Sequence, residues 1–190
     1  MLRYLYEDDV IDISKVKYKA YELSTGIKNQ IDIAKTLYHF VRDEIKHSFD
    51  INATEVTITA SDVLKAGHGI CYAKSHLLAA LLRSINIPCG FGYQKLILDD
   101  KEKPWYVLHA YNFIYLKELN KWIKVDARGN KPGVKAEFSV DKPKMAFQER
   151  VELGESDENV NHSSPKQKII DCLRMSKNTI ELANNLPKDF

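Results

Sequence analysis

The sequence predicts a mixed fold in which a buried helix leads into an antiparallel sheet. Apolar residues recur at helical spacing over residues 72–86 and make this segment apolar on nearly all sides, which is typical of a central helix. Aromatic and β-branched runs follow at 91–98, 106–116 and 122–125. A polar turn joins the last two runs, so we expect at least three antiparallel strands after the helix.

Composition places the chain among globular proteins. It has 190 residues, of which 44% are hydrophobic and 28% charged, so we expect one domain over residues 1–190 with its core at about 30–150. Lys and Arg are spread along the sequence and the net charge is +2, which argues against nucleic acid or a membrane surface as partner. An acidic N-terminus without a long apolar run favours a cytoplasmic location.

The three cysteines, Cys71, Cys89 and Cys172, are odd in number and widely spaced. They match neither a disulfide framework nor a zinc site, and no acidic cluster has the spacing of a calcium loop. We therefore expect no metal or other cofactor. Cys89 and Cys172 are expected to pack in the core.

The remaining elements follow from periodicity and turn residues. Upstream, we expect an amphipathic helix over 30–47, an irregular segment over 48–59, and a short helix over 62–65 capped by Ser61 and Asp62. Downstream, we expect a charged loop at 99–104, a further strand at 134–140 and a flexible polar segment at 152–161. A terminal helix is predicted over 165–185, with Pro165 in its first turn.

The candidate nucleophile is Cys71, which follows a glycine-flanked turn and begins the helix at 72–86. Unpaired backbone N–H groups and the positive end of the helix dipole stabilise a thiolate there, and could also stabilise the oxyanion of a tetrahedral intermediate. His109 lies within the second strand and Asp126 ends the third. The chain thus offers a nucleophile, a base and a group to orient the base.

Strand pairing brings the last two residues together. If the turn is centred near Lys117 and Glu118, His109 lies opposite Asp126, and a turn shifted by a residue or two moves this pairing by one pleat position. A carboxylate on the neighbouring strand can accept the imidazole N–H of His109. This hydrogen bond fixes the tautomer and leaves the other ring nitrogen for the thiol.

These motifs resemble the core of the transglutaminase-like superfamily over roughly residues 30–150. The matching segments are Gly-Ile-Cys71-Tyr-Ala-Lys, then His109-Ala-Tyr-Asn, then Trp122-Ile-Lys-Val-Asp126-Ala-Arg-Gly-Asn. The resemblance implies an α+β papain-like fold in which the helix that begins at the cysteine packs on an antiparallel sheet. It also implies a triad of Cys71, His109 and Asp126, acting in acyl transfer or amide hydrolysis.

The chain departs from the family pattern in two places. Cys89 and Gly90 follow the Ile-Pro pair, where members of the family often carry a basic residue, so substrate preference is open. Animal transglutaminases use an upstream Trp as oxyanion donor, whereas residues 31–69 contain neither Trp nor Gln. Asn52 and backbone amides are then the remaining candidates for the oxyanion hole.

Several residues have simpler interpretations. His109 alone could be a satisfied strand histidine, and Asp126 alone could start a turn. For Trp105, Tyr106 and Tyr111 we favour strand packing over a cleft wall, and for Arg128 and Asn130 we favour a structural role. His68 is expected in an exposed loop. His76 lies on the wrong side of the helix to serve Cys71, and no partner pattern accompanies His39, His47 or His162.

The sequence therefore predicts a cysteine enzyme that attacks a peptide or carboxamide carbonyl, with hydrolysis by a peptidase or amidase as the leading outcome. Transfer of the acyl group to an amine, as in crosslinking, is the alternative among enzymes. A non-catalytic module that binds a peptide or protein on the same fold is the alternative outside them. The substrate is expected to be a peptide or protein, and the sequence does not indicate its identity or the oligomeric state.

Overall fold

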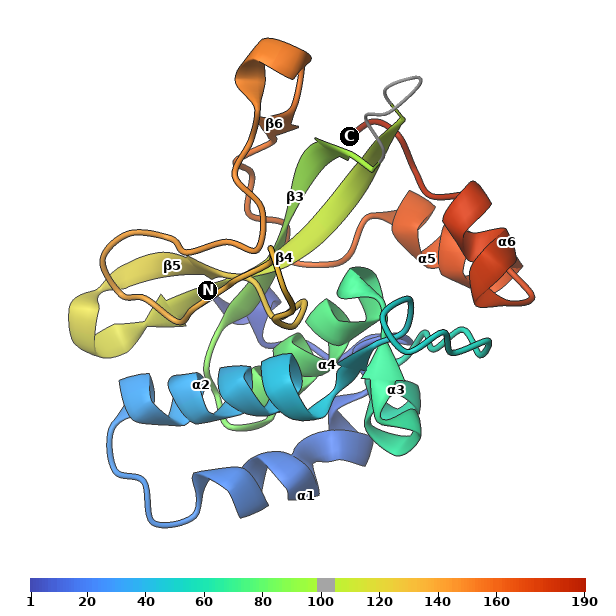
Figure 1. Ribbon diagram of the computed structural model, residues 1–190. Coiled ribbons are helices and arrows are strands. Elements are labelled where there is room, and N and C mark those ends of the chain that lie inside the picture. Colours follow the sequence, from blue (N-terminus) through green and yellow to red (C-terminus); the bar gives the residue numbers. More distant parts are fainter. Residues whose placement is uncertain (99–104) are drawn as a thin grey trace.

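The computed structural model describes residues 1–98 and 105–190, so the charged loop predicted at 99–104 lies outside the described residues. The architecture is α+β, as predicted, with helices before and after a sheet (Figure 1). The helices are α1 (Ile13–Ser24), α2 (Gln30–His39), α3 (Ala60–Ala66), α4 (Cys71–Ser84), α5 (Gln167–Met175) and α6 (Thr179–Asn184).

The main sheet is antiparallel, and its strand order is β5-β4-β3-β6. Its strands are β3 (Cys89–Ile97), β4 (Tyr106–Leu116), β5 (Lys121–Val125) and β6 (Ser156–Asp157). A separate parallel pair joins β1 (Lys46–His47) to β2 (His68–Gly69), just before α4. The predicted strands at 91–98, 106–116 and 122–125 therefore exist, and they form the expected antiparallel pairs.

Helix α4 forms the centre of the molecule and lies between the sheet and helices α1 and α3 (Figure 1). Every residue from Tyr72 to Arg83 is buried, which confirms the prediction of a central helix. A helix without a solvent face can hold its first residue in a fixed position, because neighbours pack against it on all sides.

Upstream of α4, the structure corrects three expectations. The predicted helix at 30–47 is α2 followed by a π-helical turn (Phe40–Glu44), and its last residues belong to β1. Helix α3 begins at Ala60, because Thr59 and Asp62 form a reciprocal capping box in place of the predicted Ser61–Asp62 cap. Helix α1 was not predicted, although Val16 and Ala20 form a short apolar face on it.

Downstream of β5, three further expectations are wrong. Residues 134–140 form isolated bridges in place of a strand. The polar segment at 152–161 is not a free excursion, since it contributes β6 to the sheet edge. The terminal helix is divided into α5 and α6, because Asn178 caps a new helix by accepting the Glu181 amide at 2.9 Å, and α5 itself starts after Pro165.

Among the helices of residues 1–98 and 105–190, none combines the length and the apolar character that crossing a bilayer requires.

Candidate active site

Cys71 is the first residue of α4, and its side chain is half-buried. The preceding residue, Ile70, caps the helix without a side-chain hydrogen bond. The first backbone bond of the helix runs from the Lys74 amide to the Ile70 carbonyl, at 2.9 Å. Amides earlier in the first turn therefore have no partner within the helix, which is the arrangement that stabilises an anion at this point.

His109 and Asp126 form a buried hydrogen bond, with 2.8 Å between Nε2 and Oδ2. The Asp126 carboxylate also accepts the backbone amides of Arg128 and Ala146, each at 3.0 Å. The hydroxyl of Tyr38 donates to the Asp126 carbonyl at 3.1 Å. These bonds fix the carboxylate, and through it the orientation of the imidazole.

The predicted contact between the two side chains is present, but the predicted register that placed His109 opposite Asp126 is wrong. Val125 pairs with Asn112 at the end of the ladder, so Asp126 lies beyond the ladder and not opposite His109. The turn extends to Asn120, which adopts a left-handed conformation with φ of 48°, and its centre is later than expected. Asp126 therefore reaches His109 diagonally, as one pleat position of shift allows.

The opposite charges of His109 and Asp126 stabilise each other and shift both pKa values. Burial alone would lower the pKa of His109, but the Asp126 carboxylate and the Cys71 thiol, by charge and hydrogen bonding, raise it to about 10. Burial alone would raise the pKa of Asp126, but His109 and the two backbone amides hold it below its ordinary value. The geometry thus favours an imidazolium between a carboxylate and the sulfur of Cys71.

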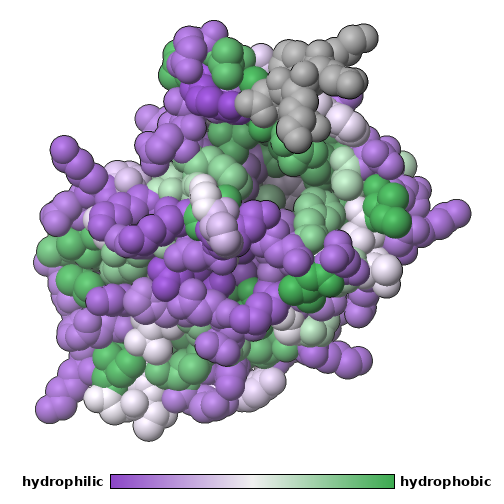
Figure 2. Space-filling view, in the orientation of Figure 1, coloured by the Kyte–Doolittle hydropathy of each residue, from purple (hydrophilic) through white to green (hydrophobic). Residues whose placement is uncertain are grey.

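Cys71 and His109 line the same cleft, which has a volume of about 420 Å³. Figure 2 shows hydrophobic side chains around a hollow between the β3–β4 strands and the C-terminal helices. Most of the wall is apolar, and it includes Phe49, Ile70, Leu96, Ile97, Leu98, Val107, Leu108, Ala146, Phe147 and Leu186. An apolar cleft with few polar groups is typical of a ligand site.

The C-terminal segment forms part of this wall. Leu186 lines the cleft, and the carbonyl of Pro187 accepts the Leu108 amide at 2.7 Å. The Leu108 carbonyl accepts the Tyr72 hydroxyl at 2.6 Å. The amide and the carbonyl of Leu108, the residue before His109, are thus both hydrogen-bonded. These bonds fix this part of β4 relative to α4.

The polar residues that line the cleft include His47 and Arg128, which were not singled out from the sequence as site residues. His47 is buried, and its Nδ1 has no hydrogen-bond partner within the described part of the chain. Arg128 forms two hydrogen bonds to the Asp50 carboxylate, at 2.6 and 2.9 Å, which is the expected structural role. Arg128 also lines the cleft. No local signal identifies His47, because its position depends on the pairing of β1 with β2.

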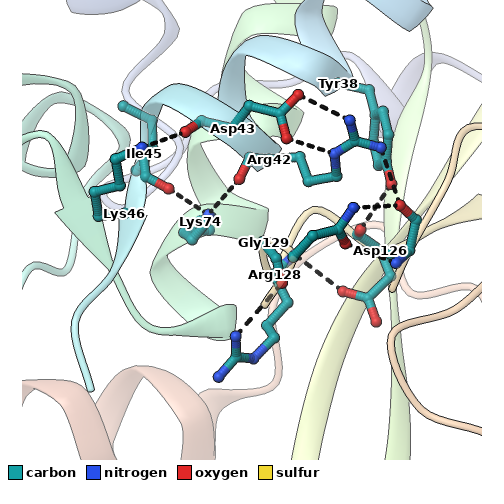
Figure 3. A network of polar contacts seen from close by, with 11 residues as sticks. Tyr38, Arg42, Asp43, Ile45, Lys46, Lys74, Asp126, Arg128 and Gly129 are labelled. Atoms are coloured by element: carbon teal, nitrogen blue, oxygen red, sulfur yellow. Dashed lines mark hydrogen bonds and ion pairs between the residues drawn. The ribbon is translucent and has the colours of Figure 1, made fainter. Parts of the chain in front are cut away.

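A buried lysine lies one turn after Cys71. The Nζ of Lys74 donates to the carbonyl oxygens of Arg42, at 3.3 Å, and Ile45 (Figure 3). Burial, with a further contribution from Arg128, lowers the pKa of Lys74 to about 7. Because the two carbonyls lie at the end of the π-helical turn, Lys74 fixes the backbone that leads into β1 and His47.

Other predicted candidates lie outside the cleft. Asn52 is exposed in a turn and is not among the lining residues. His68 was expected in an exposed loop, but it is half-buried in β2, where its Nδ1 is 3.0 Å from the Ser48 hydroxyl. His76 binds the Ile58 carbonyl at 2.8 Å. The Asn130 side chain bonds both backbone groups of Ala136. His68, His76 and Asn130 therefore have structural hydrogen bonds.

The aromatic residues and the other cysteines also fit the structural interpretation. Tyr106 and Tyr111 donate hydrogen bonds to Leu153 and Asp157, away from the cleft, and Trp105 packs against the core. Cys89 and Cys172 are buried, and burial raises their pKa values to about 12 and about 11. In the part of the chain that the structure describes, no group of three or more His, Cys, Asp or Glu side chains could hold a metal ion.

Comparisons with solved structures identify related folds. A candidate cysteine protease from Cytophaga hutchinsonii is 20% identical with a TM-score of 0.55, over 67% of this chain and 41% of that protein. A candidate protease from Parabacteroides distasonis is 12% identical with a TM-score of 0.43, over 67% of this chain and 28% of the other. A structure described as a TGase is 16% identical with a TM-score of 0.44, over 94% of this chain and 50% of the other.

This chain therefore spans less than half the length of the Cytophaga hutchinsonii protein. A search of the curated proteins found no match. The family model of the transglutaminase-like superfamily matches residues 17–127, which is more than half of the chain and includes Cys71, His109 and Asp126. On this match, the chain belongs to the transglutaminase-like superfamily.

Proposed function

We propose that this protein is a cysteine-dependent hydrolase of peptide or carboxamide bonds, with Cys71 as nucleophile, His109 as base and acid, and Asp126 as the group that orients His109. The observation that carries the proposal is the 2.8 Å hydrogen bond between His109 and Asp126 beside a cleft that Cys71 also lines. A histidine fixed by a buried carboxylate next to a thiol at a helix N-terminus is suited to nucleophilic catalysis.

The reaction follows from these positions. The sulfur of Cys71 attacks the carbonyl carbon, and the C=O electron pair moves to oxygen to give a tetrahedral intermediate. As the C–N bond breaks, the His109 imidazolium gives its proton to the leaving amine or ammonia, and an acyl thioester remains on Cys71. His109 then takes a proton from water, which attacks the thioester and releases the carboxylic acid and the sulfur.

The cleft favours an acyl donor with an apolar group. Residues from three parts of the chain form an apolar wall near Cys71, among them Phe49, Leu98 and Phe147. Burying apolar surface contributes roughly 25 cal/mol per Å², so an apolar side chain next to the scissile carbonyl would add binding energy. We therefore infer that peptides with a large apolar residue near the cleaved bond are the preferred class.

Hydrolysis is favoured over transfer to an amine. Transfer needs a second site that attracts an amine and excludes water. The pocket adjoining the cleft, about 200 Å³, contains Asp43 and Asp50, but these carboxylates already pair with Arg42, Arg128 and Lys131. A protonated amine would meet neutralised carboxylates there, so this pocket gives transfer no advantage.

The experiment is a digestion of a complex peptide mixture, read by mass spectrometry, with and without a fluorescent alkylamine. The purified wild-type protein is compared with Cys71→Ala and with the matched control Cys89→Ser, which alters a buried cysteine that does not line the cleft. We expect new peptide ends or deamidated side chains with the wild type and the control, and neither with Cys71→Ala. Incorporated alkylamine would instead indicate acyl transfer.

An unchanged peptide mixture in every sample would overturn the hydrolase proposal. If Cys71→Ala were also as competent as the wild type in binding a peptide partner, the non-catalytic module would replace it.

A further inference from the structure

His47 is placed beside the nucleophile by strand pairing. It lies opposite Gly69 in the parallel β1–β2 pair, and Gly69 is two residues before Cys71. Paired strands lie about 4.8 Å apart. Adjacent side chains alternate between the two faces of such a pair, so His47 faces the cleft, while Lys46 and His68 share the opposite face.

The His47 ring is buried without satisfying its polar atoms. The residue is 8% exposed, and its Nδ1 is buried and has no partner among the described residues. A buried polar atom without a partner costs roughly 1–3 kcal/mol, and such atoms require an explanation. The ring also makes an edge contact with Phe49, with 5.5 Å between ring centroids, which fixes its plane at the cleft wall.

The surroundings determine which ring nitrogen carries the proton. Burial, followed by the charge of Arg128, lowers the pKa of His47 well below its ordinary value, so the ring is neutral. The enclosed Nδ1 has no acceptor for a proton among the described residues. The positive charges of Arg128, Lys74 and His109 favour a bare lone pair, and the Asp50 carboxylate opposes them. The tautomer with hydrogen on Nε2 follows, and this leaves His47 with one free N–H donor.

We propose that His47 donates its Nε2–H to the oxyanion of the tetrahedral intermediate formed on Cys71, together with the amides of the first turn of α4. This inference rests on the proposed function and supplies the side-chain donor that neither Asn52 nor an upstream Trp provides. A neutral donor serves this role better than a cation, because a charged ring would compete with His109 for the thiolate.

The test compares two reagents that attack Cys71 differently. Acylation by p-nitrophenyl acetate passes through a tetrahedral oxyanion, whereas alkylation by iodoacetamide is a displacement at carbon and forms none. His47→Phe keeps the ring size and the contact with Phe49 but removes the donor. We expect acylation of this variant to slow by about 10²- to 10³-fold, the usual cost of losing one oxyanion donor, and alkylation to keep its wild-type rate.

Two further variants serve as controls. His47→Gln retains an N–H donor of similar reach, so it should recover part of the acylation rate, and it keeps the test valid if His47→Phe does not fold. His68→Phe makes the same change on the paired strand, on the face away from the cleft, and both rates should match the wild type.

Equal losses of acylation and alkylation in His47→Phe would show that the residue only supports the site, and an unchanged acylation rate would show that it has no role. Either result would overturn this inference and leave the proposed function standing. A wild-type Cys71 that neither reagent modifies would overturn both.

Discussion

The Nε2 atom of His109 lies 2.8 Å from the Oδ2 atom of Asp126, and both side chains are buried. This bond uses the ring nitrogen that faces the C-terminal end of β5, so Nδ1 is the nitrogen available to Cys71. The carboxylate cannot turn away, because it also accepts two backbone amides. Orientation of the His109 ring is therefore a property of the folded chain and does not require a substrate.

Asp126→Asn is expected to reduce hydrolysis by about 10⁴-fold, the effect of the same change in a Ser-His-Asp triad. An amide in place of the carboxylate donates to Nε2, so it forces the proton onto Nδ1 and leaves His109 in the wrong tautomer. The measurement is the rate of acylation of Cys71. Asp157→Asn, at a carboxylate that binds Tyr111 and Lys124, is the matched control, and a similar loss there would contradict the role given to Asp126.

The raised pKa of His109 predicts a pH dependence of stability. The unfolded ring loses its proton near pH 6.5, whereas the folded ring keeps it to about pH 10. The imidazolium therefore stabilises the folded protein fully below about pH 6.5, and this stabilisation is lost as the pH rises toward 10. The test uses a Cys71→Ala background, so that the thiol does not titrate. The free energy of unfolding in urea, Cys71→Ala minus the Cys71→Ala/His109→Ala double variant, should fall above pH 6.5 by up to about 1.4 kcal/mol per pH unit. A difference that does not change with pH would contradict the ion pair.

The lowered pKa of Lys74 predicts that stability depends on pH with the opposite sign. Its folded pKa is about 7 and its ordinary value 10.5, so between these limits the unfolded chain binds more protons than the folded one. The free energy of unfolding, wild type minus Lys74→Met, should therefore rise from pH 7 to about 10.5 and stay level below pH 7. Lys65→Met, at an exposed lysine of α3, is the matched control. A falling or level profile for Lys74→Met would show that the ammonium is not desolvated.

Arg83 connects three segments of the chain. Its guanidinium is buried and donates to the carbonyls of Tyr6 and Ser163, each at 2.7 Å, and twice to Cys89, at 3.1 and 2.7 Å. Arg83→Met leaves these carbonyls without a donor and should lower the free energy of unfolding in urea by about 3–5 kcal/mol. Arg83→Lys keeps the charge with a single point of donation, and we expect an intermediate loss. A fully stable Arg83→Met would contradict this account.

The sequence predicted the elements that repeat a strong local pattern. Helix α4 is apolar on nearly all sides, and β3 and β4 are long aromatic runs, so periodicity alone identifies them. The order of Cys71, His109 and Asp126 along the chain was equally visible. The hydrogen bond between the last two followed from hairpin geometry even though the register shifted, because a diagonal neighbour on the same face remains within reach.

The rest depended on contacts between distant residues. Strand β6 consists of two polar residues without periodicity, and it forms only because β3 offers an edge. The left-handed Asn120 sets the turn length, and several turn types suit that polar sequence. His47 reaches the cleft because β1 pairs with a strand some twenty residues later, so no spacing in the sequence marks it.

The most direct test is the rate of iodoacetamide alkylation of each cysteine between pH 5 and 9, mapped by mass spectrometry, for the wild type and His109→Ala. If Cys71 and His109 act as the proposed pair, we expect fast and selective labelling of Cys71 at pH 6 that His109→Ala removes, with Cys89 and Cys172 protected by burial. Labelling of Cys71 no faster than that of a free thiol, with its ordinary pKa of about 8.5, and unchanged in His109→Ala, would contradict an activated Cys71–His109 pair.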